Sequence, residues 1–223
     1  MRKRYVISTI LTAMIIIVGN CVAGTVQDFG KWETGELLLE NYSFEDDVTA
    51  WELEDGSCCD RGGLYTMEID EDNPQHGDKC LKIVGVQATG TNWHAKIKQL
   101  NVSMEGGKEY TVIFWARAEK PRQVSLSVQM QHDPWTTWRS ADIDLLGDEW
   151  MEYSHTFTAG ADVDKDMWVG LSIAQSDIDF WLDNFRFFEG QPDDEIPLDG
   201  EPQSVDAKGK LTTQWASVKS TRF

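Results

Sequence analysis

The middle of the chain alternates apolar and polar side chains. Every second residue from Val124 to Met130 is apolar and its neighbours are Ser or Gln, and Tyr110–Arg117 has the same period. A period of two places one face of a strand on a core and the other face toward solvent. The same reasoning predicts further strands at Glu36–Glu45, Trp51–Glu54, Leu64–Ile69, Lys79–Val86, His94–Leu100, Glu149–Phe157, Asp166–Ala174 and Phe180–Phe187.

Turn residues separate these segments, as in Asp60–Gly63, Asp72–Pro74 and Glu105–Gly107. No helical apolar period of useful length occurs after the first 23 residues. About ten short strands at this spacing are typical of an antiparallel sandwich or barrel. We therefore predict an all-β fold, an antiparallel β-sandwich of the jelly-roll type, over residues 34–190.

The amino terminus has the order of a secretory signal peptide. Basic residues at positions 2–4 precede an apolar run from Val6 to Val18, and Cys21-Val22-Ala23 supplies a cleavage site. The apolar run is shorter than the roughly 20 residues that span a bilayer, and a lipidated Cys21 is the other interpretation. We predict a signal peptide over residues 1–23, a secreted, periplasmic or cell-surface protein, and no membrane contact after cleavage.

The chain is strongly acidic, with 38 acidic and 20 basic residues and a net charge of −18. Cleavage would remove three basic residues and leave 17 basic against 38 acidic ones, a net charge of −21. Nucleic-acid binding needs Lys and Arg against phosphate, so this balance excludes a nucleic-acid partner. A soluble exported protein accounts for the charge.

The composition changes after Phe188. Residues 189–201 contain two of the six prolines, six acidic residues and no basic residue. Such a segment lacks the apolar surface needed to fold, so residues 191–223 are expected to be a disordered acidic linker and a short tail. The other interpretation of the tail is a short segment that docks on a partner through its apolar residues Leu211, Trp215 and Val218.

The sequence indicates neither a zinc site nor a catalytic site. Cys58, Cys59 and Cys80 allow one disulfide whose pairing stays open. The adjacent Cys58-Cys59 pair lacks the spacing with which two thiolates chelate zinc. The sequence has no nucleophile elbow, no phosphate-binding loop and no distinctive carboxylate pair. We expect a protein that is not an enzyme.

The ten tryptophans are the most informative composition signal. Trp51, Trp150 and Trp168 lie within or beside predicted strands and are expected to pack in the core. Three others lie in turns or polar loops, where an aromatic ring is costly to expose unless a ligand covers it. Sugar rings stack on such surfaces, and amide and guanidinium groups bind their hydroxyls. The resulting candidates for a carbohydrate-binding site are Trp93, Gln129, Gln131, Trp135, Trp138 and Arg139; the alternative is that Trp135 and Trp138 cap one end of the sandwich.

From about Leu38 to Phe188 the chain resembles the bacterial carbohydrate-binding modules of families 4 and 9. The resemblance rests on Asn41–Glu45, Tyr110–Glu119, Glu149–Tyr153 and Trp181–Phe185. It implies non-catalytic binding of a polysaccharide, of the β-glucan or xylan class, as single chains in a concave cleft lined by aromatic residues. Trp93 matches the first cleft aromatic, the Trp135/Trp138 loop holds the second, and Arg139 matches a cleft arginine. The alternative function is a cell-surface scaffold for protein interactions on the same jelly roll.

The same resemblance implies a structural calcium ion between the first and last strands. Its ligands would be the carboxylates of Glu45 and Asp183 and the carbonyl oxygens of Ser43 and Lys79, all hard oxygen donors. Ordinary turn hydrogen bonds are the other interpretation of Glu45 and Asp183. Gly170 and Ser172 depart from the family pattern, because some members carry a basic or imidazole sugar contact on that strand.

Overall fold

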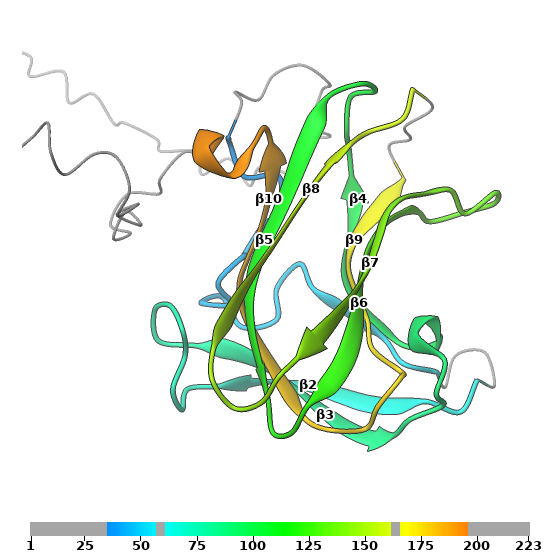
Figure 1. Cartoon of the computed structure of the whole chain (residues 1–223). Helices are drawn as coiled ribbons and strands as arrows, with labels where there is room; N and C mark the ends of the chain where they lie inside the picture. Colours follow the sequence, from blue (N-terminus) through cyan, green and yellow to red (C-terminus); the bar gives the residue numbers. More distant parts are fainter. Residues whose placement is uncertain (1–34, 57–60, 162–165, 196–223) are drawn as a thin grey trace, which may run out of the picture.

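Two antiparallel five-stranded sheets pack face to face (Figure 1). The structure, a computed structural model, describes residues 35–56, 61–161 and 166–195. Sheet A has the order β2-β3-β10-β5-β8 and sheet B the order β1-β4-β9-β6-β7. The strands are β1 Glu52–Glu54, β2 Leu64–Asp70, β3 Cys80–Gln87, β4 Lys96–Val102, β5 Glu109–Ala118, β6 Arg122–Met130, β7 Thr137–Leu145, β8 Met151–Thr158, β9 Met167–Ser172 and β10 Phe180–Glu189. The 3₁₀ turns η2, at Asn92–His94, and η3, at Pro192–Asp194, lie within the described residues. The predicted all-β sandwich is confirmed.

The core is formed by the inward residues of the alternating strands. Leu126 and Val128 of β6 are completely buried, as are Val112 and Phe114 of β5 from the other sheet. Phe114 stacks on Phe185 with ring centroids 5.1 Å apart. Burial of these apolar faces is the main favourable term that holds the two sheets together.

The chain from residue 36 to 45 is not the strand that the sequence predicted. It makes one isolated bridge, Leu37 opposite Phe188. Asn41 and Phe44 then take positive φ angles of 45° and 60°, which end the extended conformation. Phe44 nevertheless packs in the core against Trp51, with ring centroids 5.1 Å apart.

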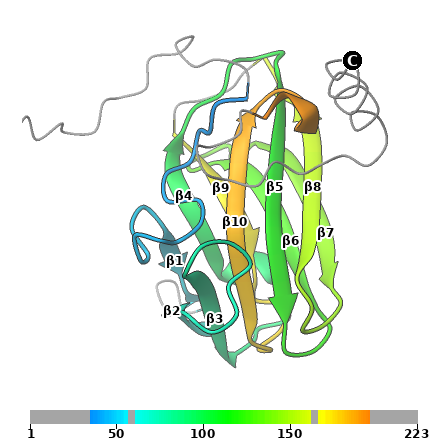
Figure 2. The ribbon, with the colours of Figure 1, turned by 90° about the vertical axis from the view of Figure 1, so that its left-hand side faces the viewer.

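Residues 35–38 lie alongside the end of β10. The Gly35 N–H donates to the carbonyl of Glu189 at 2.7 Å, and the Leu38 N–H donates to that of Phe187 at 2.8 Å. In Figure 2, β10, β5 and β8 of sheet A lie side by side, with η3 at one end of them. The first and last described segments therefore meet at one end of sheet A.

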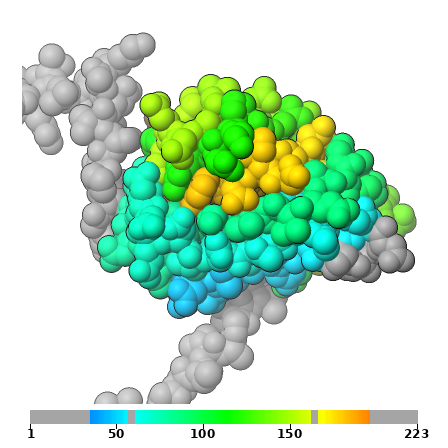
Figure 3. Space-filling view, turned by 90° about the horizontal axis from the view of Figure 1, so that it is seen from below, coloured from blue at the N-terminus to red at the C-terminus, as the bar shows by residue number. Residues whose placement is uncertain are grey.

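One end of the sandwich is closed by the connection between β9 and β10. Tyr65 of β2 donates its hydroxyl hydrogen to the carbonyl of Ser176 at 3.1 Å, and Arg122 at the start of β6 donates to the carbonyls of Ile173 and Ile178. Figure 3 shows this end, with the gold connection between the cyan and teal segments on one side and the green segments on the other. Burial lowers the pKa of Arg122 to about 10. The connection links both sheets.

No helix in the described part of the chain is long and apolar enough to cross a membrane. The predicted signal peptide over residues 1–23, most of the predicted linker and tail over residues 191–223, and Cys58 and Cys59 lie outside the described residues. Cys80 is a buried free thiol on β3.

Candidate functional site

The outer face of sheet B is polar, and we call it the polar face. The inward side chains of sheet B, such as Ile97, Leu126 and Leu171, are fully buried in the core. The residues between them point to the opposite side, because side chains alternate along a strand. They are Lys96 and Lys98 on β4, Trp168, Gly170 and Ser172 on β9, and Ser125, Ser127 and Gln129 on β6, aligned in register across the three strands.

Several side chains of the polar face are almost completely buried. Lys98 is 3% exposed, Ser125 2% and Ser172 3%. Such low exposures on the outer side of a sheet mean that side chains from the margins reach over it. One of these is Asn92 of η2, whose amide donates to the Ser125 hydroxyl at 2.6 Å.

Two exposed tryptophans lie at the margins of the polar face. Trp93 is in η2 and is 49% exposed, and Trp135 is in the β6–β7 loop and is 53% exposed. In Figure 1 both η2 and the tip of the β6–β7 hairpin project from the outer side of sheet B. The Gln129 amide donates to the carbonyl of Trp135 at 2.9 Å. Outward side chains of β6 thus hold both margins, Ser125 that of Trp93 and Gln129 that of Trp135.

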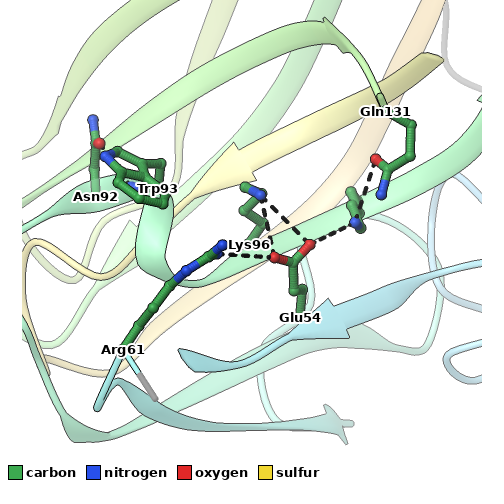
Figure 4. Close-up of polar contacts among 7 residues, drawn as sticks. Glu54, Arg61, Asn92, Trp93, Lys96 and Gln131 are labelled. Carbon is green, nitrogen blue, oxygen red and sulfur yellow. Dashed lines mark hydrogen bonds and ion pairs between the residues drawn. The ribbon is translucent and has the colours of Figure 1, made fainter. Parts of the chain in front are cut away.

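A cluster of three cations around one carboxylate lies beside the Trp93 margin (Figure 4). We call Glu54, Arg61, Lys96 and Lys98 the Glu54 cluster. The nitrogen–oxygen distances to Glu54 are 3.3 Å from Arg61 Nη1, 3.3 Å from Lys96 Nζ and 2.7 Å from Lys98 Nζ. The Arg61 guanidinium also lies 4.8 Å from the centroid of the Trp93 ring, and Lys98 contacts the Gln131 side-chain oxygen at 3.5 Å.

The cluster shifts the pKa of its members. Burial raises the pKa of Glu54, but hydrogen bonds and charges from Lys98 and Lys96 outweigh this effect and hold the pKa below its ordinary value. The pKa of Lys96 is lowered, first by burial and further by the charges of Lys98 and Arg61, against the opposing effect of Glu54. One carboxylate does not fully compensate the three cations.

Trp168 forms the floor beneath the two lysines. Its ring centroid lies 5.5 Å from Lys96 Nζ and 6.0 Å from Lys98 Nζ, and its side chain is only 2% exposed. The sequence placed Trp168 in the core, whereas it is buried on the polar face under the lysines. Trp51 is in the core as predicted. Trp150 is not, because it lies at the surface of sheet A, where its ring is 5.2 Å from the Arg117 guanidinium.

The structure does not bring Trp138 and Arg139 to the polar face. Trp138 packs against the core, and an Arg139 guanidinium nitrogen lies 2.9 Å from Nδ1 of His155 on β8 of the other sheet. A β-bulge causes this, because the pairing of β6 with β7 shifts by one residue between Val128 and Gln129. Burial and the charge of Arg139 lower the pKa of His155.

The predicted calcium ligands lie around the loop before β3. An oxygen of Glu45 accepts the backbone N–H groups of Asp78 and Lys79, at 2.9 and 3.1 Å. An oxygen of Asp183, which is fully buried, accepts those of Gln75 and His76, both at 2.9 Å. We expected Glu45 at the end of a first strand, next to the strand that carries Asp183. Glu45 lies in a turn instead, so the prediction that the two carboxylates occupy adjacent strands was wrong.

The surroundings of Asp183 fit a cation. Burial raises the pKa of Asp183 to about 7, and the charge of Glu45 adds to this effect against three backbone hydrogen bonds. The side-chain oxygen of the next residue, Asn184, is buried and has no donor among the described residues. Within the same described ranges no group of three or more His, Cys, Asp and Glu side chains could hold a metal, so backbone carbonyls such as those of Ser43 and Lys79 would have to complete a shell.

Sequence reasoning missed Asn92 and the whole Glu54 cluster. The signal for the lysines was present, because Lys96 and Lys98 alternate with the apolar Ile97 on β4. Glu54 and Arg61 gave no comparable signal, since their contact with β4 depends on how β1 pairs with it.

Residues 37–173 match a family model described as a carbohydrate binding domain, CBM_4_9. This match covers more than half of the chain. No curated protein sequence matches the chain.

Solved structures share the fold at low sequence identity. A structure titled "CBM4 structure and function" has a TM-score of 0.58 at 19% identity, covering 67% of this chain and 98% of its own. The CBM22-1 xylan-binding domain from Paenibacillus barcinonensis Xyn10C has a TM-score of 0.54 at 15% identity, covering 71% and 97%. A family 16 carbohydrate binding module has a TM-score of 0.51 at 19% identity, covering 69% and 100%.

Proposed function

Since the chain belongs to the CBM_4_9 family of carbohydrate binding domains, we propose that it holds a single polysaccharide chain across the polar face of sheet B and catalyses no reaction itself. We further propose that it does so outside the cytoplasm. The polysaccharide would be β-linked, of the β-glucan or xylan class. A xylan-binding domain of similar fold makes xylan a rational first probe.

The observation that carries this proposal is the pair of exposed indoles at the margins of the polar face. Trp93 and Trp135 are each about half exposed, although large aromatic side chains gain most by burial. A sugar ring stacked on each would cover that surface. The hydroxyl and ammonium groups of the polar face, from Ser127 and Lys96 for example, are suited to a sugar's hydroxyl groups. Two separated indoles suit a single extended chain, whereas a crystalline surface calls for one flat platform.

A structural calcium ion at Glu45 and Asp183 is a second proposal. It is supported by the two chain-distant carboxylates that hold the same loop, by the raised pKa of Asp183 and by the buried oxygen of Asn184. Bound there, the ion would neutralise the carboxylates and fix the loop between residues 75 and 79 to β10.

The direct test measures, by calorimetry, how the purified protein binds soluble xylan, soluble mixed-linkage β-glucan and cello-oligosaccharides. We expect binding to at least one of them, and loss of that binding in a Trp93→Ala/Trp135→Ala double variant that keeps its fold. A protein that binds none of these and no glycan on a broad array would instead favour the protein-interaction scaffold.

A further inference from the structure

The polar face holds a cluster of cations, although the whole chain is acidic. The protein carries a net charge of −18. On the polar face, however, Arg61, Lys96 and Lys98 surround the single carboxylate of Glu54. Three other carboxylates belong to this face, and they lie on its two edge strands: Glu52 on β1, and Asp142 and Asp144 on β7. The three cations are therefore gathered around one carboxylate near Trp93, in a molecule that is acidic as a whole.

These cations are more enclosed than those of ordinary surface ion pairs. The side chains of Lys98 and Lys96 are 3% and 14% exposed, and that of Arg61 is 27% exposed. Placing a cation in such surroundings is unfavourable unless an anion compensates it. Glu54 supplies one negative charge for three positive ones. A bound anion would supply the missing compensation.

The cations also adjoin the proposed stacking surface. The Arg61 guanidinium lies against the Trp93 ring and is at the same time in contact with Glu54 (Figure 4). The half of the Trp93 side chain that remains exposed can take a sugar ring. A carboxylate on that sugar, or on its neighbour, would then lie within reach of Arg61 and Lys96. Guanidinium and ammonium groups form their strongest hydrogen bonds with carboxylates.

We propose, on the basis of the proposed glycan-binding function, that the polar face selects a polysaccharide that carries carboxylates, that is, uronic acid residues, and that the Glu54 cluster binds them. Glu54 acts in this scheme as the protein's own counter-ion, which the carboxylate of the glycan partly displaces. A neutral sugar would gain only the stacking and hydroxyl contacts.

The test compares glucuronoxylan with the same polymer after chemical reduction of its carboxylates to alcohols. The two probes have the same backbone and differ in charge. We expect the native polymer to bind about three- to tenfold more tightly at low salt, and this preference to shrink at 0.5 M NaCl, because salt screens exposed charges.

Two variants with opposite expected effects make the test specific. Lys96→Gln should remove most of the preference for the native polymer. It should weaken binding of the reduced polymer much less, because the reduced polymer loses a hydroxyl contact, for which the glutamine amide can substitute, and no charge contact. Glu54→Gln should increase the preference, because it frees the cations from their internal partner. Lys120→Gln is the matched control: it removes the same charge from an exposed lysine, 67% of whose side chain is accessible, away from the polar face. It should leave the preference unchanged.

The outcomes separate this proposal from the one on which it rests. Equal binding of the two polymers, or a Lys120→Gln effect as large as that of Lys96→Gln, would overturn the selection of carboxylates and leave the glycan-binding function intact. Binding of neither polymer, together with no binding of neutral β-glucan, would overturn both.

Discussion

Replacing Trp93 by alanine is the sharpest test of the polar face as a glycan-binding surface. The ring is 49% exposed, so about 100 Å² of a tryptophan side chain remains for a ligand to cover. At about 25 cal/mol per Å², complete coverage would contribute up to about 2.5 kcal/mol. Ordering of the glycan and imperfect coverage reduce this gain. We therefore expect Trp93→Ala to weaken polysaccharide binding at least about tenfold, which corresponds to about 1.4 kcal/mol.

The same substitution should have a small effect on folding. The Trp93 ring packs against two side chains. The Arg61 guanidinium lies 4.8 Å from the centroid of the Trp93 ring, and the His94 ring centroid lies 4.4 Å from it. Loss of a cation–π contact at a partly exposed site costs about 0.5–1 kcal/mol. Calorimetric titration gives the affinity, and urea denaturation gives the free energy of unfolding of the same preparation.

Trp181→Ala is the matched control for this experiment. Trp181 is a partly exposed tryptophan on the outer face of sheet A, with the Arg117 guanidinium 3.9 Å from its ring centroid. Its loss should destabilise the fold and leave glycan affinity unchanged. If Trp93→Ala binds as the unmodified protein does, while Trp181→Ala binds less, the ligand lies on sheet A and the assignment of the polar face is incorrect.

Three further outcomes are expected. A chelator should lower the melting temperature, added calcium should restore it, and Asp183→Asn should remove this dependence; an unchanged melt in protein shown to be free of metal would contradict the calcium site. The folded-state pKa of Glu54 is lowered, so its contribution to stability is present above its unfolded pKa of 4.5 and is lost as the pH falls through the folded value. The difference in unfolding free energy between the unmodified protein and Glu54→Gln should thus shrink from pH 7 to pH 3, and a constant difference would argue against the ion pairs. Phe114→Ala should cost about 3–5 kcal/mol by chemical denaturation, because the ring is completely buried and stacked on its neighbours; a loss below about 1 kcal/mol would mean that the site collapses around the cavity.

The fold could be predicted because it depends on a repeated local pattern. Alternation along β5 and β6 specifies which side of each strand is buried, and the turn residues specify where strands end. The segment from residue 36 to 45 could not be predicted in the same way. Its apolar residues do reach the core, but positive φ angles at Asn41 and Phe44 carry them there without a regular strand.

The site was predictable only in part, because alternation breaks where the site is built. Trp93 and Trp135 could be identified since turn residues surround them. Trp138 could not be placed, because a single bulge reverses which side of β7 a residue faces. The Glu54 cluster brings together Glu54 of β1, the two lysines of β4 and Arg61. Most of these contacts join segments that are distant in sequence, and a local sequence pattern cannot predict them.

The meeting of residues 35–38 with the end of β10 has a mechanical consequence. A force that pulls these two segments apart would break the Gly35–Glu189 hydrogen bond first and the Leu38–Phe187 hydrogen bond next. The load would fall first on sheet A and last on the strands β4, β9 and β6 that carry the polar face. If the module is pulled from this end, sheet A therefore loses its hydrogen bonds first, and the proposed glycan-binding face of sheet B keeps its structure.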